Sequence, residues 1–184
     1  KNIFFRKILE LIANIDKRVK LPKYNSETFE IFFKNNVNKI SLERKVERKV
    51  VIYSTCFVNF NKKNTGVAAL KVLKKNGVEV EHAYPGCCGM PFLEQADLLK
   101  VAEQAKKISK DLLKWIDRGY EVITLTASCG LMLKFEWPLL LSEDKNIKKL
   151  SKHVFDIDEY IVDIAEKEGL APGLNEIDGG VTVH

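Results

Sequence analysis

The sequence predicts an α/β fold: a three-layer domain built on a small, mainly parallel sheet of about four strands, preceded by an N-terminal helix and a connector. Two observations support this prediction. Short β-rich segments alternate with amphipathic helical segments between residues 49 and 170, which is the pattern of βαβ units. The length of 184 residues suits one domain with an appendage. We therefore divide the chain into a helix and connector (1–48), an α/β domain (49–170) and a linker that leads into a truncated further element (171–184).

The strands are predicted from runs of β-branched and aromatic residues, of which Val50-Val51-Ile52-Tyr53 is the clearest. In chain order the expected strands are 49–55, 78–84, 120–126 and 152–155. Val181 has the character of the start of another strand. The chain begins without Met, at Lys1, and we expect it to be a piece of a longer protein.

The helices are predicted from apolar residues that recur at three- and four-residue spacing. In chain order they are 3–19, 65–76, 94–118, 131–137 and 156–168. Thr65 and Asp156 are expected N-caps, and Gly77 is an expected C-terminal stop. Leu21-Pro22 is expected to end the first helix, and Pro138 the fourth.

The net charge of +5 is concentrated at one end of the chain. Residues 1–23 hold seven basic and two acidic side chains, which is the whole excess. A nucleic-acid surface would spread positive charge over the domain, so we expect no nucleic-acid partner. The basic helix within residues 1–20 either packs on its own protein or makes peripheral contact with an anionic membrane. Residues 24–48 follow as a connector that docks through Phe29, Phe32 and Phe33 and then becomes solvated.

The composition, with 46 % hydrophobic and 30 % charged residues, is that of a globular chain. It excludes a disordered tail, a collagen-like fibre and a disulfide-dense miniprotein. No run approaches the ~18 uncharged apolar residues of a transmembrane helix, and no secretory signal is recognisable. Phosphate-binding glycine motifs and the serine motif of hydrolases are also missing from the sequence.

The four cysteines are the most informative residues in the sequence. Cys56 follows the first expected strand, Cys87 and Cys88 follow the second, and Cys129 follows the third. Parallel strands place their carboxyl ends at one edge of the sheet, where ligand sites of open α/β sheets form. We therefore expect the four thiols to converge.

Four converging thiols favour a metal centre. Thiolates are the preferred ligands of iron–sulfur clusters and of structural zinc, and the spacing is that of neither a ferredoxin run nor a zinc ribbon. A metal-free thiol redox element that uses Cys87-Cys88, and four inert buried cysteines, are the alternatives. His82 and Trp137 are interpreted as structural residues rather than as a ligand or an electron relay.

Several stretches resemble a known family in order and spacing. They are Leu21-Pro22-Lys23-Tyr24, Cys56-Phe57-Val58-Asn59-Phe60-Asn61, Cys87-Cys88-Gly89-Met90-Pro91, and Ser128-Cys129 followed by Glu136-Trp137-Pro138. The chain is thereby similar to the CCG cysteine-rich domain of the B subunits of heterodisulfide reductases, of the iron–sulfur subunit of glycolate oxidase and of lactate-utilisation proteins. The resemblance is strongest to the C subunits of anaerobic glycerol-3-phosphate dehydrogenases, and this chain corresponds to a fragment with the first CCG domain.

The resemblance implies a role in anaerobic respiration. Such subunits pass electrons from a flavin-containing dehydrogenase subunit towards a membrane quinone, at the cytoplasmic face of the inner membrane. Cys56, Cys87, Cys88 and Cys129 would then hold an iron–sulfur cluster, with a 4Fe–4S cluster favoured and zinc as the alternative. The heterodisulfide reductase pattern has a fifth cysteine where this sequence has Met132, which argues against a non-cubane cluster. The fragment alone is not expected to turn over a substrate.

Overall fold

The computed structural model describes residues 3–20, 22–42, 44, 47–173 and 179–180. Its centre is a four-stranded sheet in the order β2-β1-β3-β4, with all neighbouring strands parallel. The strands are β1 (Lys49–Tyr53), β2 (Glu79–Ala83), β3 (Glu121–Thr124) and β4 (Val154–Asp156). The predicted fold class is therefore confirmed, with strands slightly shorter than expected.

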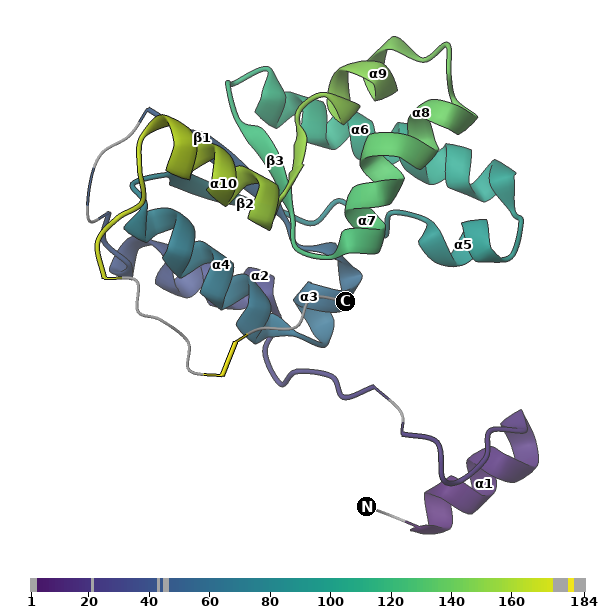
Figure 1. Ribbon diagram of the computed structural model, residues 1–184. Coiled ribbons are helices and arrows are strands. Elements are labelled where there is room, and N and C mark those ends of the chain that lie inside the picture. Colours follow the sequence, from purple (N-terminus) through teal and green to yellow (C-terminus); the bar gives the residue numbers. More distant parts are fainter. Residues whose placement is uncertain (1–2, 21, 43, 45–46, 174–178, 181–184) are drawn as a thin grey trace.

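Helices cover both faces of the sheet (Figure 1). They are α1 (Ile3–Ala13), α2 (Phe29–Asn36), α3 (Thr55–Phe60), α4 (Lys63–Lys75), α5 (Met90–Glu94), α6 (Leu98–Ile116), α7 (Ala127–Leu131), α8 (Trp137–Leu140), α9 (Lys145–Ser151) and α10 (Ile157–Lys167). A 3₁₀ turn (Val37–Lys39) follows α2, and a π-helical turn (Met132–Glu136) joins α7 to α8.

The sheet separates two hydrophobic cores. Along β1, Val51 and Tyr53 face α6 and the α7–α9 region, whereas Val50 and Ile52 face α2, α4 and α10. This alternation follows from the two-residue period of a strand, and burial on both faces is typical of a central parallel strand. The connection from β1 crosses one face and the connection from β3 crosses the other. The crevice at the carboxyl ends of β1 and β3 is thus a topological switch point.

The expected connector contains a helix that the sequence analysis did not predict. Thr28 caps α2 by accepting a hydrogen bond from the backbone N–H of Ile31. Phe29 and Phe33 are 0 % and 5 % exposed and pack into the core beside β1 and β2. The docking through aromatic residues is confirmed.

Helix boundaries differ from expectation where single residues adopt unexpected backbone angles. The helix expected at 94–118 begins later, at Leu98 as α6, because Ala96 is left-handed (φ 58°) and Asp97 caps α6. Glu94 instead ends the separate helix α5. The expected N-cap Thr65 is wrong, since α4 begins at Lys63. Pro138 lies inside α8 and does not end it, because a proline is tolerated in the first turn of a helix.

Two expected ends are confirmed and one extra helix is present. Asp156 caps α10 in a capping box with Glu159, and Gly77 ends α4 at φ 83°. Asp144 caps α9, which the sequence analysis did not predict. The strand expected at Val181 lies outside the described residues.

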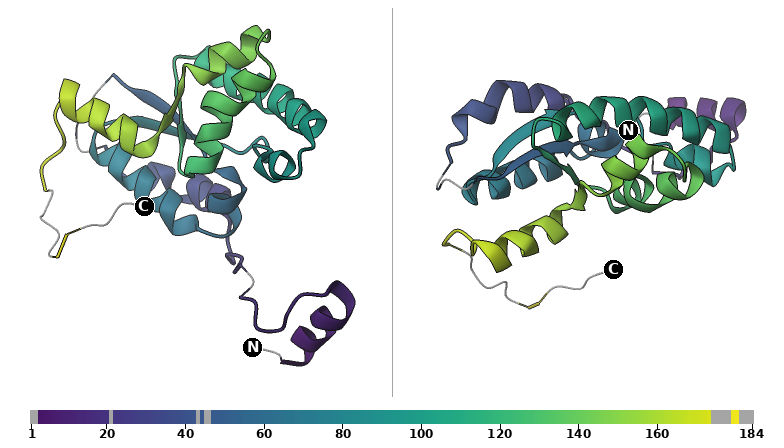
Figure 2. Two further views of the ribbon diagram at one scale, coloured as in Figure 1. Left: turned by 45° about the vertical axis from the view of Figure 1, so that its right-hand side comes forward. Right: turned by 90° about the horizontal axis from the view of Figure 1, so that it is seen from above.

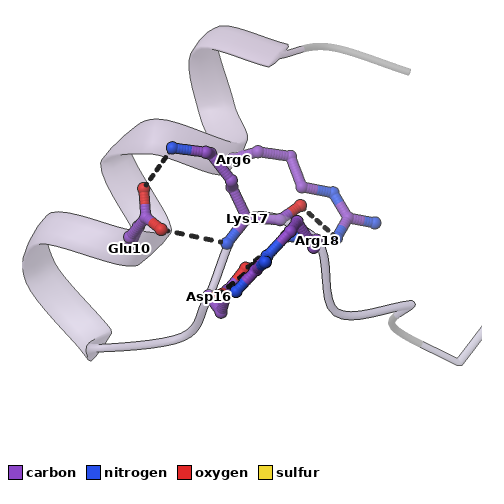
Figure 3. A network of polar contacts seen from close by, with 5 residues as sticks. All are labelled: Arg6, Glu10, Asp16, Lys17 and Arg18. Carbon is purple, nitrogen blue, oxygen red and sulfur yellow. Dashed lines mark hydrogen bonds and ion pairs between the residues drawn. The ribbon is translucent and has the colours of Figure 1, made fainter.

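Helix α1 lies apart from the α/β body, at the end of an extended segment (Figures 1 and 2). It ends at Ala13 rather than at residue 19, because Asn14 is left-handed (φ 52°). The chain then folds back: the backbone N–H of Lys17 donates to Glu10, and Arg18 pairs with Asp16 at 2.6 Å (Figure 3). No residue of α1 is buried, and most of its large apolar side chains are exposed. Among the described residues, no helix combines the length and apolar character needed to cross a membrane.

Candidate functional site: four thiols at the carboxyl edge of the sheet

The structure brings the four cysteines together at the switch point. Cys56 is the second residue of α3, directly beyond β1, and Cys129 is the third residue of α7, directly beyond β3. Cys87 and Cys88 occupy the turn between β2 and α5. The sequence analysis expected no helix at Cys56 or Cys129, so their positions in α3 and α7 are a correction. Both helices begin within a few residues of a strand end, and convergence is therefore unaffected.

The thiols contact one another in a chain. The Sγ of Cys88 donates to the Sγ of Cys129 at a distance of 3.2 Å. Cys87 interacts through its thiol with Cys88 on one side and with Cys56 on the other. Cys88 and Cys129 are buried, at 2 % and 5 % exposure, whereas Cys56 and Cys87 are only partly buried. One end of the chain of thiols thus faces solvent and the other faces the core.

Mutual contact and burial shift the thiol pKa values. The hydrogen bond to Cys129 raises the pKa of Cys88 to about 12, and the same hydrogen bond lowers the pKa of Cys129. Contact with Cys88 raises the pKa of Cys87, and burial raises the pKa of Cys56. The four sulfurs therefore resist simultaneous ionisation in the absence of a cation, as expected for like charges in one place.

Backbone N–H groups donate hydrogen bonds to three of the sulfurs. The amides of Gly89 and Met90 hydrogen-bond Cys87 and Cys88 and lower their pKa values, and the amide of Phe57 does the same for Cys56. The left-handed conformation of Gly89 (φ 89°) permits this close turn. Such donors stabilise negative charge on sulfur and are the kind of contact that tunes a thiolate-bound metal centre.

Two buried aromatic residues hold the cysteine turn in place. The hydroxyl of Tyr53 donates to the carbonyl of Gly86 at 2.7 Å, and the indole N–H of Trp137 donates to the carbonyl of Cys88 at 3.1 Å. Tyr53 and Trp137 are both 0 % exposed. The structural interpretation of Trp137 is supported, but its role in positioning Cys88 was not predicted. A buried indole N–H requires a partner, and only the tertiary structure identifies that partner.

Tyr84 is a further residue that sequence analysis did not single out. Burial and the proximity of all four cysteines, Cys56 first, raise the pKa of its phenol to about 12. Its ring packs edge-on against Phe60 of α3, with ring centroids 5.5 Å apart. Tyr84 therefore connects the turn that carries Cys87 to the helix that carries Cys56.

The residue before Cys56 is backbone-strained. Thr55 is 1 % exposed and adopts φ 58°, which is an outlier for a β-branched residue. Its hydroxyl lies 3.2 Å from the hydroxyl of Thr126, at the start of α7. On the other side, Gly130 allows close packing, since a Cβ there would lie 2.8 Å from the Oγ1 of Thr124. The first contact links the starts of α3 and α7, and the second packs α7 closely against β3.

Thiols are the ligand type expected of a metal centre. The distances between these sulfur atoms, however, do not match those of a site that holds a metal. Among the described residues, no group of three or more His, Cys, Asp or Glu side chains is arranged to hold a single metal ion. The Cys88–Cys129 distance of 3.2 Å is shorter than the roughly 3.8 Å that tetrahedral geometry gives for a metal–sulfur bond of ~2.3 Å. The sulfurs must therefore separate when a metal or cluster binds.

His82 and Met132 take positions beside the site rather than in it. His82 packs on the rings of Phe29 and Phe33 and contacts the hydroxyl of Ser54 at 2.9 Å, which supports its structural interpretation. Met132 is 0 % exposed, and its Cε lies 3.9 Å from the position of a Cβ at Gly89. Position 132, where the sequence resemblance would imply a fifth cysteine, is thus filled by a core methionine.

Comparison with known families agrees with this geometry. Residues 50–134 match the family model described as "CCG: Cysteine-rich domain", and this segment contains all four cysteines. The predicted resemblance to CCG cysteine-rich domains is therefore confirmed for residues 50–134.

Curated relatives extend the match beyond that segment. Lactate utilization protein A of Bacillus pumilus (strain SAFR-032) is 30 % identical over 141 residues, which cover 74 % of this chain and 56 % of the relative. The corresponding protein of Macrococcus caseolyticus (strain JCSC5402) is 28 % identical, with 74 % of this chain and 54 % of the relative covered. The C subunit of the anaerobic glycerol-3-phosphate dehydrogenase of Escherichia coli (strain K12) is 28 % identical over 151 residues, or 81 % of this chain and 37 % of the relative. The chain thus spans between about a third and just over half of these relatives. No solved structure matches the chain significantly.

Proposed function

We propose that this chain is an electron-transfer module that holds an iron–sulfur cluster, of the 4Fe–4S type, through Cys56, Cys87, Cys88 and Cys129. The observation that carries the proposal is the convergence of four thiols from three neighbouring strand ends. Four thiolates are the ligand set of such clusters, which supply one-electron redox chemistry when bound. The CCG domain match and the redox relatives support the same interpretation.

The protein's own residues prepare this site in three ways. The amides of Phe57, Gly89 and Met90 donate to the sulfurs and offset negative charge there. Tyr53 and Trp137 hold the turn through the carbonyls of Gly86 and Cys88. Deep burial of Cys88 and Cys129 excludes water on one side. The partly buried Cys56 and Cys87 leave the other side open to a redox partner.

The larger context is proposed from the relatives' names. One relative is a subunit of anaerobic glycerol-3-phosphate dehydrogenase and others are lactate utilization proteins. We propose that this chain likewise works beside a flavin-containing dehydrogenase subunit and passes electrons towards a membrane quinone. The exposed apolar and basic side chains of α1 are the proposed peripheral contact with the cytoplasmic face of the membrane. We also propose that residues 49–170 form one structural unit.

Two alternatives have specific support. A zinc-stabilised interaction module needs the same four thiolates, and the core residue Met132 leaves no fifth thiol. A metal-free thiol redox module is favoured by the direct contact between Cys88 and Cys129. Both alternatives predict a protein without stoichiometric iron.

The deciding experiment is anaerobic purification followed by iron, sulfide and zinc analysis and a visible spectrum near ~400 nm, where iron–thiolate charge transfer absorbs. Stoichiometric iron and sulfide, with absorbance that dithionite bleaches, supports the proposal. Stoichiometric zinc without colour supports the structural alternative. A metal-free protein that exchanges two electrons reversibly supports the thiol module. Met132→Leu is purified and analysed in the same way as a control, because it alters a core side chain beside the site without removing a thiol.

A further inference from the structure

An apolar groove of about 440 Å³ lies between α4 and α10, on the face of the sheet opposite α6. Its lining is mostly apolar and includes Ala69, Val72, Leu125, Ile161 and Val162. Val72 and Val162 are 43 % and 55 % exposed, so the groove is open to solvent. None of these residues contributes to the thiol site. An exposed apolar groove is a typical docking surface.

Helix α1 presents an apolar face that its own copy leaves exposed (Figures 1 and 2). Leu11 and Ile12 are 87 % and 79 % exposed. The segment that folds back onto α1 covers the other face of the helix, because the backbone of Lys17 bonds to Arg6 and Glu10, which lie one turn apart (Figure 3). An isolated helix of 11 residues is marginal in water, and its stability depends on packing of the apolar face. A second surface is therefore needed to cover α1.

The helix and the groove match in length. The large apolar residues of α1 from Phe4 to Ile12 span about two turns. The groove is bordered by residues 65–72 of α4 and 157–162 of α10, which is also about two turns of each helix. Ala68 lines the α4 wall, and small side chains allow close approach of another helix. The groove thus has the dimensions that the apolar face of α1 requires.

The charges at the borders of the two surfaces favour one orientation. Lys7 lies one turn from Leu11 and borders the apolar face of α1, whereas Asp158 lines the α10 wall of the groove. Neither Lys7 nor Asp158 forms an ion pair within the residues that the structure describes. The opposite border of α1 is formed by Leu9 and Ala13, which bring no charge to the α4 wall. In this orientation the ammonium group of Lys7 faces a complementary carboxylate.

We propose that α1 of a second copy of this chain occupies the groove, and that two copies exchange their α1 helices reciprocally. Because α1 stands away from its own α/β body (Figure 2), each copy offers one helix and one groove, and a twofold arrangement covers both. Exchange of an identical element is a low-cost route to a dimer, and an amphipathic helix in an apolar groove is a recurring mode of recognition. The dimer does not depend on a cluster, since neither surface contains a thiol. It covers the face of α1 that is also the proposed membrane contact.

The test is sedimentation equilibrium of the whole chain over a range of concentrations, with a reductant that prevents disulfide bonds between copies. Leu11→Gln alters the helix and Val162→Gln alters the groove. The matched control is Leu99→Gln, because Leu99 is 86 % exposed and lies at the start of α6, outside the groove. Glutamine retains helix propensity, and circular dichroism spectra establish that each variant folds. The measurement uses neither metal nor lipid, so its outcome is separate from those of the cluster and of the membrane contact.

A photoreactive benzoylphenylalanine in place of Val72 identifies the occupant of the groove by peptide mass mapping. We expect Leu11→Gln and Val162→Gln each to raise the dimer dissociation constant at least tenfold, and Leu99→Gln to change it less than twofold. Cross-links from position 72 are expected to join two copies and to map to residues 3–13. A chain that stays monomeric at all concentrations overturns the proposal. A dimer that survives both substitutions also overturns it, as do cross-links that join position 72 to another part of the same copy.

Discussion

The sulfur atoms of Cys88 and Cys129 lie 3.2 Å apart, although 41 positions separate them in the sequence. Their closeness follows from the topology, because β1 lies between β2 and β3 in the sheet and all three strands end at one edge. This distance is longer than the ~2.05 Å of a disulfide bond, and a movement of about 1 Å would bring the two sulfurs to bonding distance. Cys87 contacts both Cys56 and Cys88, so the contacting thiols form a continuous series from Cys56 to Cys129.

This relationship predicts which disulfide forms when the metal-free protein is oxidised with a small disulfide reagent. The reagent forms a mixed disulfide at the partly buried Cys87, and exchange along the contacting thiols transfers the bond to Cys88 and Cys129. Peptide mass mapping is expected to find Cys88 joined to Cys129, with Cys56→Ser leaving this product unchanged. A predominant Cys87-Cys88 linkage would contradict this prediction, because exchange would then stop at the first pair of contacting thiols.

Replacement of Trp137 by Phe is expected to loosen the cysteine turn. The ring volume is largely retained, but the carbonyl of Cys88 loses its buried donor. A buried group left unsatisfied costs about 1–3 kcal/mol, which urea unfolding measures. Metal content after anaerobic reconstitution should fall in parallel. The matched control is Trp115→Phe on α6, whose ring packs edge-on against Tyr120 and faces the guanidinium of Arg118 instead. Equal effects of the two substitutions would contradict a positioning role for Trp137.

Replacement of Gly130 by Ala is expected to push α7, and with it Cys129, away from β3. The new Cβ would lie 2.8 Å from the Oγ1 of Thr124, which is fully buried and cannot swing away. Overpacking of this kind costs about 1–3 kcal/mol. Removing the obstructing hydroxyl with Thr124→Ala should make the double variant bind metal better than Gly130→Ala alone. A double-mutant cycle with no coupling between the two sites would rule out this steric explanation.

His82 predicts a pH-dependent stability that is separate from the thiols. Burial lowers its pKa to about 4, with Glu30 opposing this shift and Lys34 adding to it. The unfolded state, with a pKa near 6.5, therefore binds more protons than the folded state between these two values. Stability is full above pH ~6.5 and is lost as the pH falls towards 4, by about 2 kcal/mol at pH 5.

The measurement is urea unfolding at pH 7 and pH 5 for the native chain and for His82→Gln. The variant should lose roughly half or more of the pH dependence, because glutamine keeps a polar contact with Ser54 but does not titrate in this range. An unchanged difference between the two pH values in the variant would assign the effect to other groups.

The sequence was informative where short-range physics decides the structure. The alternation of β-branched strands with amphipathic helices predicted the parallel sheet, and the placement of Cys56, Cys87, Cys88 and Cys129 after strand ends predicted their convergence. Local capping chemistry located the start of α10 at Asp156. Each of these predictions used residues close in sequence to the strand, cysteine or helix start that it located.

Other features depend on contacts that no local pattern encodes. Asn14 ends α1 by a left-handed backbone, although the apolar spacing continues to Ile15. Thr55 turns the chain into α3 with a strained angle, so Cys56 lies on a helix. The partners of Tyr53 and Trp137 are carbonyls 33 and 49 positions away. A sequence shows that buried hydroxyl and indole groups need acceptors, but it does not identify those acceptors.

If all four thiols hold one iron–sulfur cluster, the iron content of the protein depends on each of the four cysteines. Native chain and single Cys→Ala variants at positions 56, 87, 88 and 129 would be reconstituted anaerobically with iron and sulfide, and analysed beside Met132→Leu. We expect stoichiometric iron in the native chain and in Met132→Leu, and a large loss of iron in each of the four cysteine variants. Iron bound equally well by all variants, or zinc bound in its place by the native chain, would contradict it.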